Sequence, residues 1–172
     1  MSCYLCKSDQ YSQRAGSVRD NSNIDILECS DCGLVYLSSL NHIQHGHYEE
    51  SGMHNDKVPD IDNWLKETEF DDKRRFKFIK EKITNKTILD FGCGIGGFLE
   101  KSKKSADKVT GVELEIALQP SFKKRGLNVF LNLSAAKENN QKYDIITAFH
   151  VVEHLQDPKS ILKDLSELLA GG

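Results

Sequence analysis

The second half of the chain alternates short apolar runs with longer polar or amphipathic stretches. Four of these runs have the length and composition of buried strands. They occupy residues 87–91, 108–113, 128–132 and 143–149. Helical signals lie between and after them, including Pro120 in a first turn and Asp157 as an N-cap. Strands separated by helices predict an α/β fold with a doubly wound, Rossmann-like parallel sheet, whose ligands bind at the carboxyl ends of the strands.

A long amphipathic helix is predicted ahead of the first strand, over residues 63–83. Its apolar positions, such as Leu65, Ile79 and Ile83, recur at helical intervals. Acidic side chains stand beside its basic ones, so the charged residues are expected to form a solvated face rather than a nucleic-acid site. They are Glu67, Glu69, Asp71 and Asp72 among the acids and Lys73, Arg74, Arg75, Lys77 and Lys80 among the bases.

Two Cys-x-x-Cys pairs lie near the N-terminus. They consist of Cys3, Cys6, Cys29 and Cys32. In a reducing compartment such pairs are typical of a tetrahedral Zn²⁺ site rather than of disulfides. Gly33 supplies a tight turn after the second pair, and a short hairpin is expected between the pairs. Because four thiolates leave no open position, the predicted zinc is structural, and residues 1–37 are predicted to form a small zinc-ribbon-like arm.

Residues 38–62 have little periodicity and many turn-forming side chains, which is typical of a linker. No cysteine or carboxylate pattern frames its histidines, so a polar connector or a mobile lid is favoured over a second metal site. These histidines are His42, His45, His47 and His54. The predicted organisation is therefore an arm, this linker and one domain over residues 63–172.

Composition and charge narrow the range of partners. The 172 residues include 23 Lys and Arg against 26 Asp and Glu, a net charge of −3, so no overall positive field attracts nucleic acid. No apolar run approaches the ~20 residues needed to cross a bilayer. The N-terminus has neither a basic leader nor an apolar stretch typical of a secretion signal. We therefore expect a cytoplasmic protein that acts on a small molecule, with no membrane or nucleic-acid partner.

A glycine-rich loop follows the first predicted strand, over residues 92–97. Gly92 and Gly94 remove side chains where a ligand must touch the backbone, and the next helix presents free N–H groups to an anion. With Gly97 they also match the dinucleotide fingerprint, and Glu113 follows Gly92 by 21 residues, where a ribose-binding acid belongs. The glycines alone therefore leave an NAD-dependent oxidoreductase as an alternative.

Asp90, two residues before the first of these glycines, separates the two interpretations. A carboxylate there would face the diphosphate of NAD, a like-charge contact that costs about 1–4 kcal/mol at ~4 Å. S-adenosylmethionine (SAM) has no phosphate, and its ammonium and sulfonium groups are attracted to a carboxylate. Charge therefore favours SAM as the cofactor.

Three segments resemble motifs of the class I SAM-dependent methyltransferases, in the order that this family has them. Residues 89–96 resemble the first motif, Val112-Glu113 the acid that ends strand two, and residues 143–158 the fourth-strand motif. The N-terminal cysteine arm is similar to that of bacterial sugar C-methyltransferases. The resemblance implies methyl transfer to a small molecule, such as a sugar or another metabolite of a polysaccharide or natural-product pathway.

The resemblance also implies a cofactor site at the carboxyl ends of the strands. Asp90 and the glycine backbone would hold the methionine part, Glu113 the ribose hydroxyls, and Asn132 with its neighbour the adenine. Family members often have aspartate at this adenine position. The implied members of the site are Asp90, Phe91, Gly92, Cys93, Gly94, Glu113, Leu114, Asn132, Leu133 and His150.

The candidate catalytic residues, His150, Glu153 and His154, stand just past the fourth predicted strand. If the segment makes a helical turn, their spacing of i, i+3 and i+4 brings them to one side. Either histidine is a hypothetical general base, because imidazole titrates near neutrality. A metal site is a second hypothesis, since ubiquinone-type methyltransferases that resemble this segment carry carboxylates and a histidine there. Local hydrogen bonding is the third.

The family fold normally has seven strands, whereas this chain ends at Gly171-Gly172, the usual turn into strand five. We therefore expect an incomplete class I methyltransferase fold in which the fourth strand is an exposed edge. A second copy or a partner chain would pair with that edge. Much of the acceptor pocket would be missing, so this chain alone is expected to be inactive or impaired. A non-catalytic zinc-ribbon interaction module is a further alternative.

Overall fold

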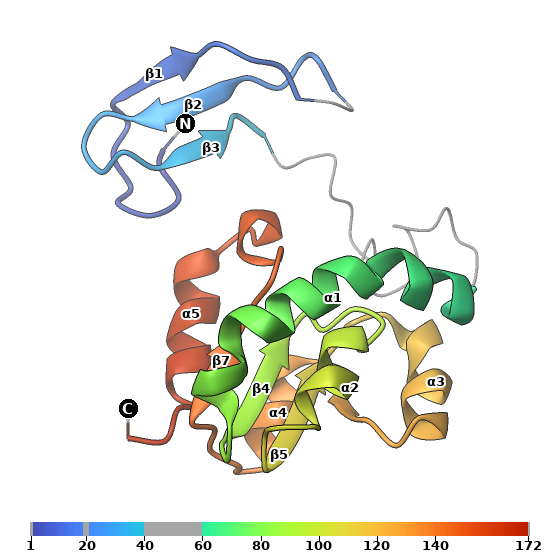
Figure 1. The fold of residues 1–172 in the computed structure, drawn as a ribbon. Helices are drawn as coiled ribbons and strands as arrows, with labels where there is room; N and C mark the ends of the chain where they lie inside the picture. The colour runs from blue at the N-terminus through green and yellow to red at the C-terminus, as the bar shows by residue number, and fades with distance from the viewer. Residues whose placement is uncertain (1, 19–20, 40–59, 172) are drawn as a thin grey trace. The chain divides into compact units, whose positions relative to one another are not determined.

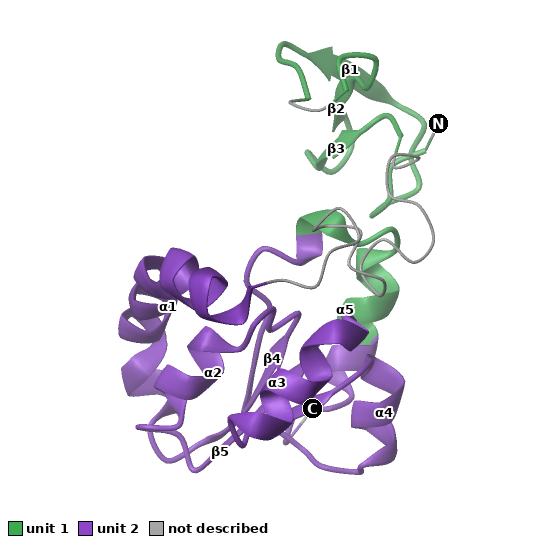
Figure 2. Cartoon of the chain, turned by 90° about the vertical axis from the view of Figure 1, so that its right-hand side faces the viewer, with its two compact units in different colours: residues 1–45, 153–163 green, residues 46–152, 164–172 purple. Residues whose placement is uncertain are grey.

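The computed structural model describes residues 2–18, 21–39 and 60–171. The chain divides into two compact units, one of residues 1–45 and 153–163 and one of residues 46–152 and 164–172 (Figure 2). The four linker histidines, His42, His45, His47 and His54, lie outside the described residues. Within the described ranges, none of the helices has the length and apolar character that a membrane span requires.

The first unit contains a three-stranded antiparallel sheet in the order β1-β2-β3 (Figure 1). Its strands are β1 (Tyr11–Arg14), β2 (Ile26–Cys29) and β3 (Val35–Leu37). β1 and β2 form the hairpin expected between the cysteine pairs, with Tyr11 opposite Cys29. The small core is built from Cys3, Leu27, Cys29 and Tyr36. Two of these four are cysteines, so the apolar core of the arm depends on the same residues as its candidate metal site.

The second unit contains a parallel sheet in the order β6-β5-β4-β7. Its strands are β4 (Thr87–Phe91), β5 (Lys108–Val112), β6 (Asn128–Phe130) and β7 (Ile145–Thr147). Each of the four predicted runs contains one strand, and the first has the predicted limits. β7 is shorter than predicted: Tyr143 instead forms an isolated parallel bridge with Leu169, and the Asp144 carboxylate accepts hydrogen bonds from the Thr87 N–H and hydroxyl, at 2.7 and 2.8 Å.

Helices connect the strands and cover both faces of this sheet. The helices of this unit are α1 (Ile61–Ile83), α2 (Gly97–Ser102), η2 (Ile116–Leu118), α3 (Gln119–Lys124) and α4 (Leu133–Glu138). Two later elements, η3 (Val152–His154) and α5 (Pro158–Ser166), fall mostly within residues 153–163 of the first unit. α1 and α2 lie side by side on one face and α4 lies on the other (Figures 1 and 2). The predicted doubly wound α/β fold is therefore confirmed.

A hydrophobic core between α1, α2 and the sheet fixes the position of the loop after β4. Ile79 and Ile83 of α1 pack with Ile88 of β4 and Phe98 of α2, and all four side chains are buried. Burying an aliphatic or aromatic side chain of this size stabilises the fold by about 1.5–3 kcal/mol. This cluster holds α1 against the segment that follows β4.

The prediction of a fully solvated charged face on α1 is wrong for two residues. The side chains of Asp72 and Arg75 are only 6% and 22% exposed. Both face α2 and the end of the sheet, because α1 packs along α2. The prediction holds for Lys73 and Arg74, which are exposed and pair with Glu69 and Asp71.

Candidate functional site

The loop after β4 turns sharply at three glycines. Gly92, Gly94 and Gly96 have φ values of +71°, +52° and +82°, a region that side-chain-bearing residues rarely adopt. The N–H groups of Gly92 and Cys93 both donate to the Val112 carbonyl, at 2.9 and 3.0 Å. The loop is therefore held against the end of β5.

Asp90 lies in β4 between Gly111 of β5 and Thr147 of β7. It is 3% exposed, and its Oδ1 accepts a hydrogen bond of 2.6 Å from the Thr147 hydroxyl. Burial raises the pKa of Asp90 to about 7. The sequence places this acid correctly beside the glycine loop, but its charge at neutral pH is set by packing that the sequence does not reveal.

Glu113 directly follows β5, and its carboxylate links the glycine loop after β4 to the loop after β5. Its Oε2 accepts a hydrogen bond from the Gly94 N–H at 2.8 Å, and its Oε1 accepts one from the Glu115 N–H at 3.0 Å. Burial raises the pKa of Glu113, although both of these hydrogen bonds favour the ionised form. A carboxylate has about four acceptor positions, so Glu113 retains capacity to accept hydrogen bonds from a ligand.

Cys93 points into the protein. It is 8% exposed, and a Cβ on Gly111 would lie 2.6 Å from its Sγ. Burial raises the pKa of its thiol well above the usual value. Cys93 therefore packs as a small apolar residue between β4 and β5, and its backbone is the part that belongs to the glycine loop.

Gly97 makes room for α1. A Cβ at this position would lie 2.1 Å from Oδ2 of Asp72, so only glycine allows the carboxylate to rest there. The same Oδ2 accepts a hydrogen bond of 3.0 Å from the Thr68 hydroxyl, and burial raises the pKa of Asp72. The third glycine of the fingerprint therefore accommodates a side chain of the protein itself.

Arg75 also belongs to this region, and sequence reasoning missed it. Its guanidinium carbon lies 5.4 Å from the centre of the Phe149 ring, and its Nη1 lies 3.7 Å from Oδ1 of Asp72. The Arg75 Nε is buried and has no hydrogen-bond partner among the described residues. Nothing in a run of basic residues distinguishes Arg75 from its neighbours, and only the three-residue spacing from Asp72 hints at it.

The residues predicted to frame the adenine lie at the carboxyl end of β6. Asn132 is exposed and caps α4, because its Oδ1 accepts a hydrogen bond of 2.9 Å from the Ala135 N–H. The Phe130 carbonyl accepts a hydrogen bond from the Glu113 N–H, which brings this end next to β5. Leu114, Leu133 and Phe91 are half-buried, and each lies at or just past the carboxyl end of a strand of this sheet.

The three candidate catalytic residues lie on a turn and a short 3₁₀ helix. His150 is exposed and has a left-handed backbone with φ +55°, so it precedes the helix instead of joining it. Glu153 and His154 fall within η3, and both are exposed. The helical turn that would align all three therefore covers only two of them. Their proposed roles remain predictions.

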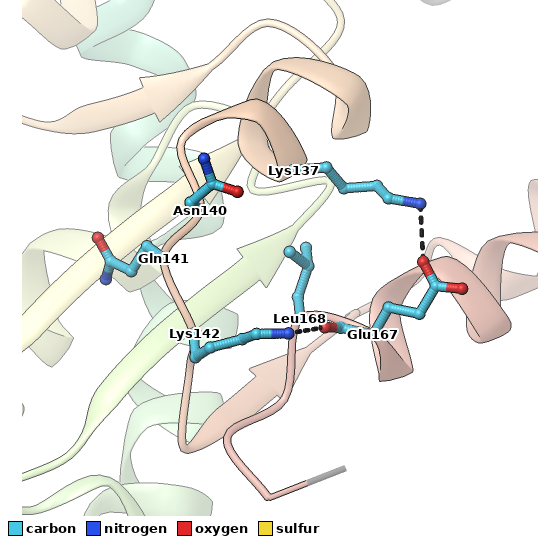
Figure 3. A pocket seen from close by; sticks show the side chains of 6 residues that line it. All are labelled: Lys137, Asn140, Gln141, Lys142, Glu167 and Leu168. Carbon is cyan, nitrogen blue, oxygen red and sulfur yellow. Dashed lines mark hydrogen bonds and ion pairs between the residues drawn. The ribbon is translucent and has the colours of Figure 1, made fainter.

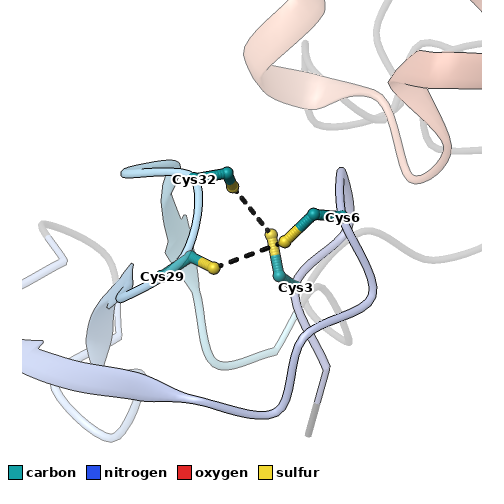
Figure 4. Close-up of side chains that lie close together, drawn as sticks. All are labelled: Cys3, Cys6, Cys29 and Cys32. Atoms are coloured by element: carbon teal, nitrogen blue, oxygen red, sulfur yellow. Dashed lines mark hydrogen bonds between the residues drawn. The ribbon is translucent and has the colours of Figure 1, made fainter.

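The four cysteines converge in the first unit (Figure 4). The Sγ atoms of Cys3 and Cys32 are 3.6 Å apart, those of Cys6 and Cys29 are 3.5 Å apart, and all four lie within 4.8 Å of one another. Zn–S bonds of ≈ 2.3 Å in a tetrahedron place sulfurs about 3.8 Å apart. Among the residues that the structure describes, this is the one group of three or more His, Cys, Asp or Glu side chains close enough to hold a metal ion.

The four thiols do not ionise independently of one another. The backbone N–H of Cys6 lowers the pKa of Cys3 to about 6. The pKa of Cys32 is raised to about 12, although the Leu34 N–H favours its thiolate, because burial and the neighbouring sulfurs oppose another negative charge. Full ionisation of the cluster therefore requires a positive charge at its centre, and the donor set fits Zn²⁺.

A polar cavity of about 230 Å³ lies between the end of α4 and the turn after α5 (Figure 3). It is lined by Lys137, Asn140, Gln141, Lys142, Glu167 and Leu168. The Lys137 ammonium pairs with Asp164 and Glu167, and the Lys142 ammonium donates to the Glu167 carbonyl. The cations are already paired and the cavity lies near the amino end of β7, so it is no part of the glycine-loop site.

Comparison with known proteins identifies the second half of the chain. A family described as a methyltransferase domain matches residues 61–172. The ubiquinone biosynthesis O-methyltransferases of Hydrogenovibrio crunogenus and Coxiella burnetii are 34% and 32% identical over 108 and 107 residues, 57% of this chain in each case. These matches cover 45% and 46% of the two relatives, so the chain spans about half the length of the curated relatives it matches.

Solved structures show the same fold. The CcbJ methyltransferase from Streptomyces caelestis superposes with a TM-score of 0.51 at 18% identity, over 59% of this chain and 46% of that one. The magnesium protoporphyrin IX methyltransferase from Synechocystis gives 0.50 at 11% identity, over 76% and 71%. The glycine loop, the two acids beside it and the matched family agree, and the chain belongs to the methyltransferase domain family.

Proposed function

We propose that the second unit binds SAM at the carboxyl ends of β4, β5 and β6 and transfers its methyl group to a small-molecule acceptor. The observation that carries this proposal is the pairing of a buried acid, Asp90, with a glycine loop that Glu113 holds through the Gly94 N–H. SAM supplies an electrophilic methyl group on a sulfonium. The chain supplies negative charge for the cationic part of the cofactor and acceptor oxygens for its hydroxyls.

Arg75 extends this proposed site. Its guanidinium stacks on Phe149, at the carboxyl end of β7, and its Nε is buried without a partner among the described residues. A guanidinium in this position is suited to the carboxylate of an amino-acid-like ligand, since it binds carboxylates in a planar, bidentate geometry. The site would then offer one cation and two acids to a ligand that carries one carboxylate and two cationic groups.

Calorimetry with SAM and with NADH tests the proposal. We expect SAM to bind, NADH not to bind, and Asp90→Asn to weaken SAM binding at least 10-fold at pH 8. Asp107→Asn is the matched control, because it removes an exposed acid just before the neighbouring strand β5 and should leave the affinity unchanged. Binding of NADH alone would overturn the assignment, and binding of neither ligand would favour a non-catalytic role.

The cysteine arm and the curated relatives point to two classes of methyl acceptor. The cysteine arm suggests a sugar or related metabolite, whereas the relatives reported above are named for O-methylation in ubiquinone biosynthesis. A panel of nucleotide sugars and catechols with isotope-labelled SAM separates these classes. Loss of transfer in His150→Ala or His154→Ala, with SAM binding unchanged, would support the base hypothesis, and transfer that survives the double substitution would exclude it.

We further propose that the cysteine cluster holds one structural Zn²⁺. The tetrahedron-like sulfur spacing and the small core around Cys3 and Cys29 support it. Elemental analysis should find one zinc per chain, and Cys32→Ser should lower that content sharply. Cys93→Ala is the control, because Cys93 is buried beside Gly111 in the second unit and should not change the zinc content. A wild-type chain that folds its arm without metal would refute the proposal.

A further inference from the structure

Thr147, at the end of β7, donates its hydroxyl proton to Asp90. The Oγ1–Oδ1 distance is 2.6 Å, and the two residues are 6% and 3% exposed. The nearest competing acceptor, the Leu89 carbonyl oxygen, lies 3.4 Å from the same hydroxyl. Because a hydroxyl has a single proton and the shorter contact is with a carboxyl group, the proton points to Asp90.

The charged groups around Asp90 oppose one another. Asp72 of α1 and Glu113 after β5 disfavour its ionisation, whereas Arg75 of α1 favours it. Burial outweighs them all and raises the pKa of Asp90 to about 7, and the hydrogen bond from Thr147 is the largest of the influences that lower it. At neutral pH the charge of Asp90 is therefore finely balanced, and Thr147 has more effect on it than the distant guanidinium.

We infer that Thr147 is a positioning residue of the SAM site, whose hydroxyl holds the Asp90 carboxylate ionised and oriented toward a cationic ligand. Thr147 does not itself touch the ligand in this assignment, and it acts only through Asp90. The inference rests on the proposed function for the identity of that ligand. The effect of Thr147 on the charge of Asp90 is independent of any ligand, so the two claims are measured separately.

The first measurement is a ¹³C NMR titration of the Asp90 carboxyl carbon in the ligand-free chain. Losing a hydrogen bond to a charged group is expected to raise the pKa of Asp90 by about one to two in Thr147→Val. Thr147→Ser keeps the hydroxyl and should titrate near the wild type. Thr110→Val is the matched control, since Thr110 is a buried threonine of β5 whose hydroxyl accepts from Asn128 rather than contacting Asp90.

The second measurement is SAM affinity by calorimetry between pH 6 and pH 9.5. If only the ionised form binds, Thr147→Val should weaken binding about five- to fifty-fold at pH 7 and much less at pH 9.5. An equal loss at every pH, or an unchanged Asp90 titration, would overturn the inference. If the wild-type chain binds no SAM at any pH, the proposed function fails, while the NMR titration still decides whether Thr147 controls the charge of Asp90.

Discussion

The close approach of Asp72 to Gly97 makes a sharp prediction about the stability of the second unit. Gly97→Ala places a methyl group 2.1 Å from Oδ2 and 3.0 Å from Cγ of Asp72, far inside ordinary van der Waals contact. The carboxylate must then leave Gly97 and its hydrogen bond with Thr68. Overpacking of a core costs about 1–3 kcal/mol and a lost hydrogen bond to a charged group about 1.5–3 kcal/mol. We expect Gly97→Ala to lower the free energy of unfolding by about 2–4 kcal/mol.

The same substitution should be nearly harmless once the carboxylate is gone. In an Asp72→Ala background the added methyl group meets only Cδ2 of Leu65, at an ordinary van der Waals distance of 3.5 Å. Alanine is also a better helix former than glycine by about 1 kcal/mol. The double-mutant cycle should therefore show a coupling energy of about 2 kcal/mol or more between positions 72 and 97. Trp64, the single tryptophan, packs against the core of the second unit, so its fluorescence in a urea titration reports this unfolding.

Gly126→Ala provides the control for backbone strain. Gly126 has φ +62° and nothing within 4 Å of an added Cβ, so alanine there introduces strain without a clash. Its destabilisation should be the same with and without Asp72. If Gly97→Ala costs the same free energy in both backgrounds, or if it destabilises no more than Gly126→Ala, the steric argument for Gly97 is refuted.

Four other predictions concern the site and the arm. SAM affinity should rise as the pH increases through about 7, because the ionised carboxylate of Asp90 is the form that attracts a cation, and Asp90→Asn should flatten this dependence in calorimetry. Because the pKa of Asp90 is raised in the folded state, the folded chain binds this proton more tightly than the unfolded chain does. Protonated Asp90 therefore contributes stability that is lost as the pH rises from about 4 towards 7. Urea titrations of Asp90→Asn should lack this pH-dependent contribution to the free energy of unfolding. A strong chelator should abolish the ordered β1–β3 signals in an NMR spectrum while the Trp64 fluorescence stays constant, since the cysteine cluster is separate from the core of the second unit. Asn132→Ala should destabilise the second unit by about 1 kcal/mol in the same fluorescence assay by uncapping α4, whereas Asn132→Asp should not.

The strands could be predicted because each is marked by an apolar run within its own residues. β4 is a continuous apolar run around one acid, and its predicted limits, Thr87–Phe91, agree with the structure. All three of the short helices α2, α3 and α4 have six residues, too few for an apolar period to emerge, but the glycine loop marks the start of α2 and Pro120 marks α3, whereas α4 was missed because it has neither signal. Its remaining signal was Asn132, which the sequence analysis assigned to the adenine site instead. One residue can serve as a cap and still present its amide to a ligand, so the two assignments do not conflict.

The sequence predicted only those residues of the site that lie at the ends of predicted strands. Asp90 is the last residue but one of β4 and Glu113 directly follows β5, and parallel strands bring their carboxyl ends together. Asp72 and Arg75 reach the same region through the packing of α1 on α2, which joins residues 25 positions apart in the sequence, as at Asp72 and Gly97. In the sequence both stand in a run of mixed charges that is typical of an exposed helix. Asp72 and Arg75 differ from the other charged residues of this run because they are buried, and no local sequence pattern predicts that burial.

The structure brings more negative charge to the glycine loop than Asp90 alone, which favours a cationic ligand. Burial raises the pKa values of three acids, Asp72, Asp90 and Glu113. The charges of Asp72 and Glu113 further disfavour the ionisation of Asp90. Arg75 of α1 favours ionisation of both Asp72 and Asp90, and its Nη1 lies 3.7 Å from Oδ1 of Asp72. A diphosphate in the glycine loop would add negative charge to a region that already resists it. A ligand with an ammonium and a sulfonium would instead stabilise the ionised acids, so the same burial that raises their pKa values selects against a dinucleotide.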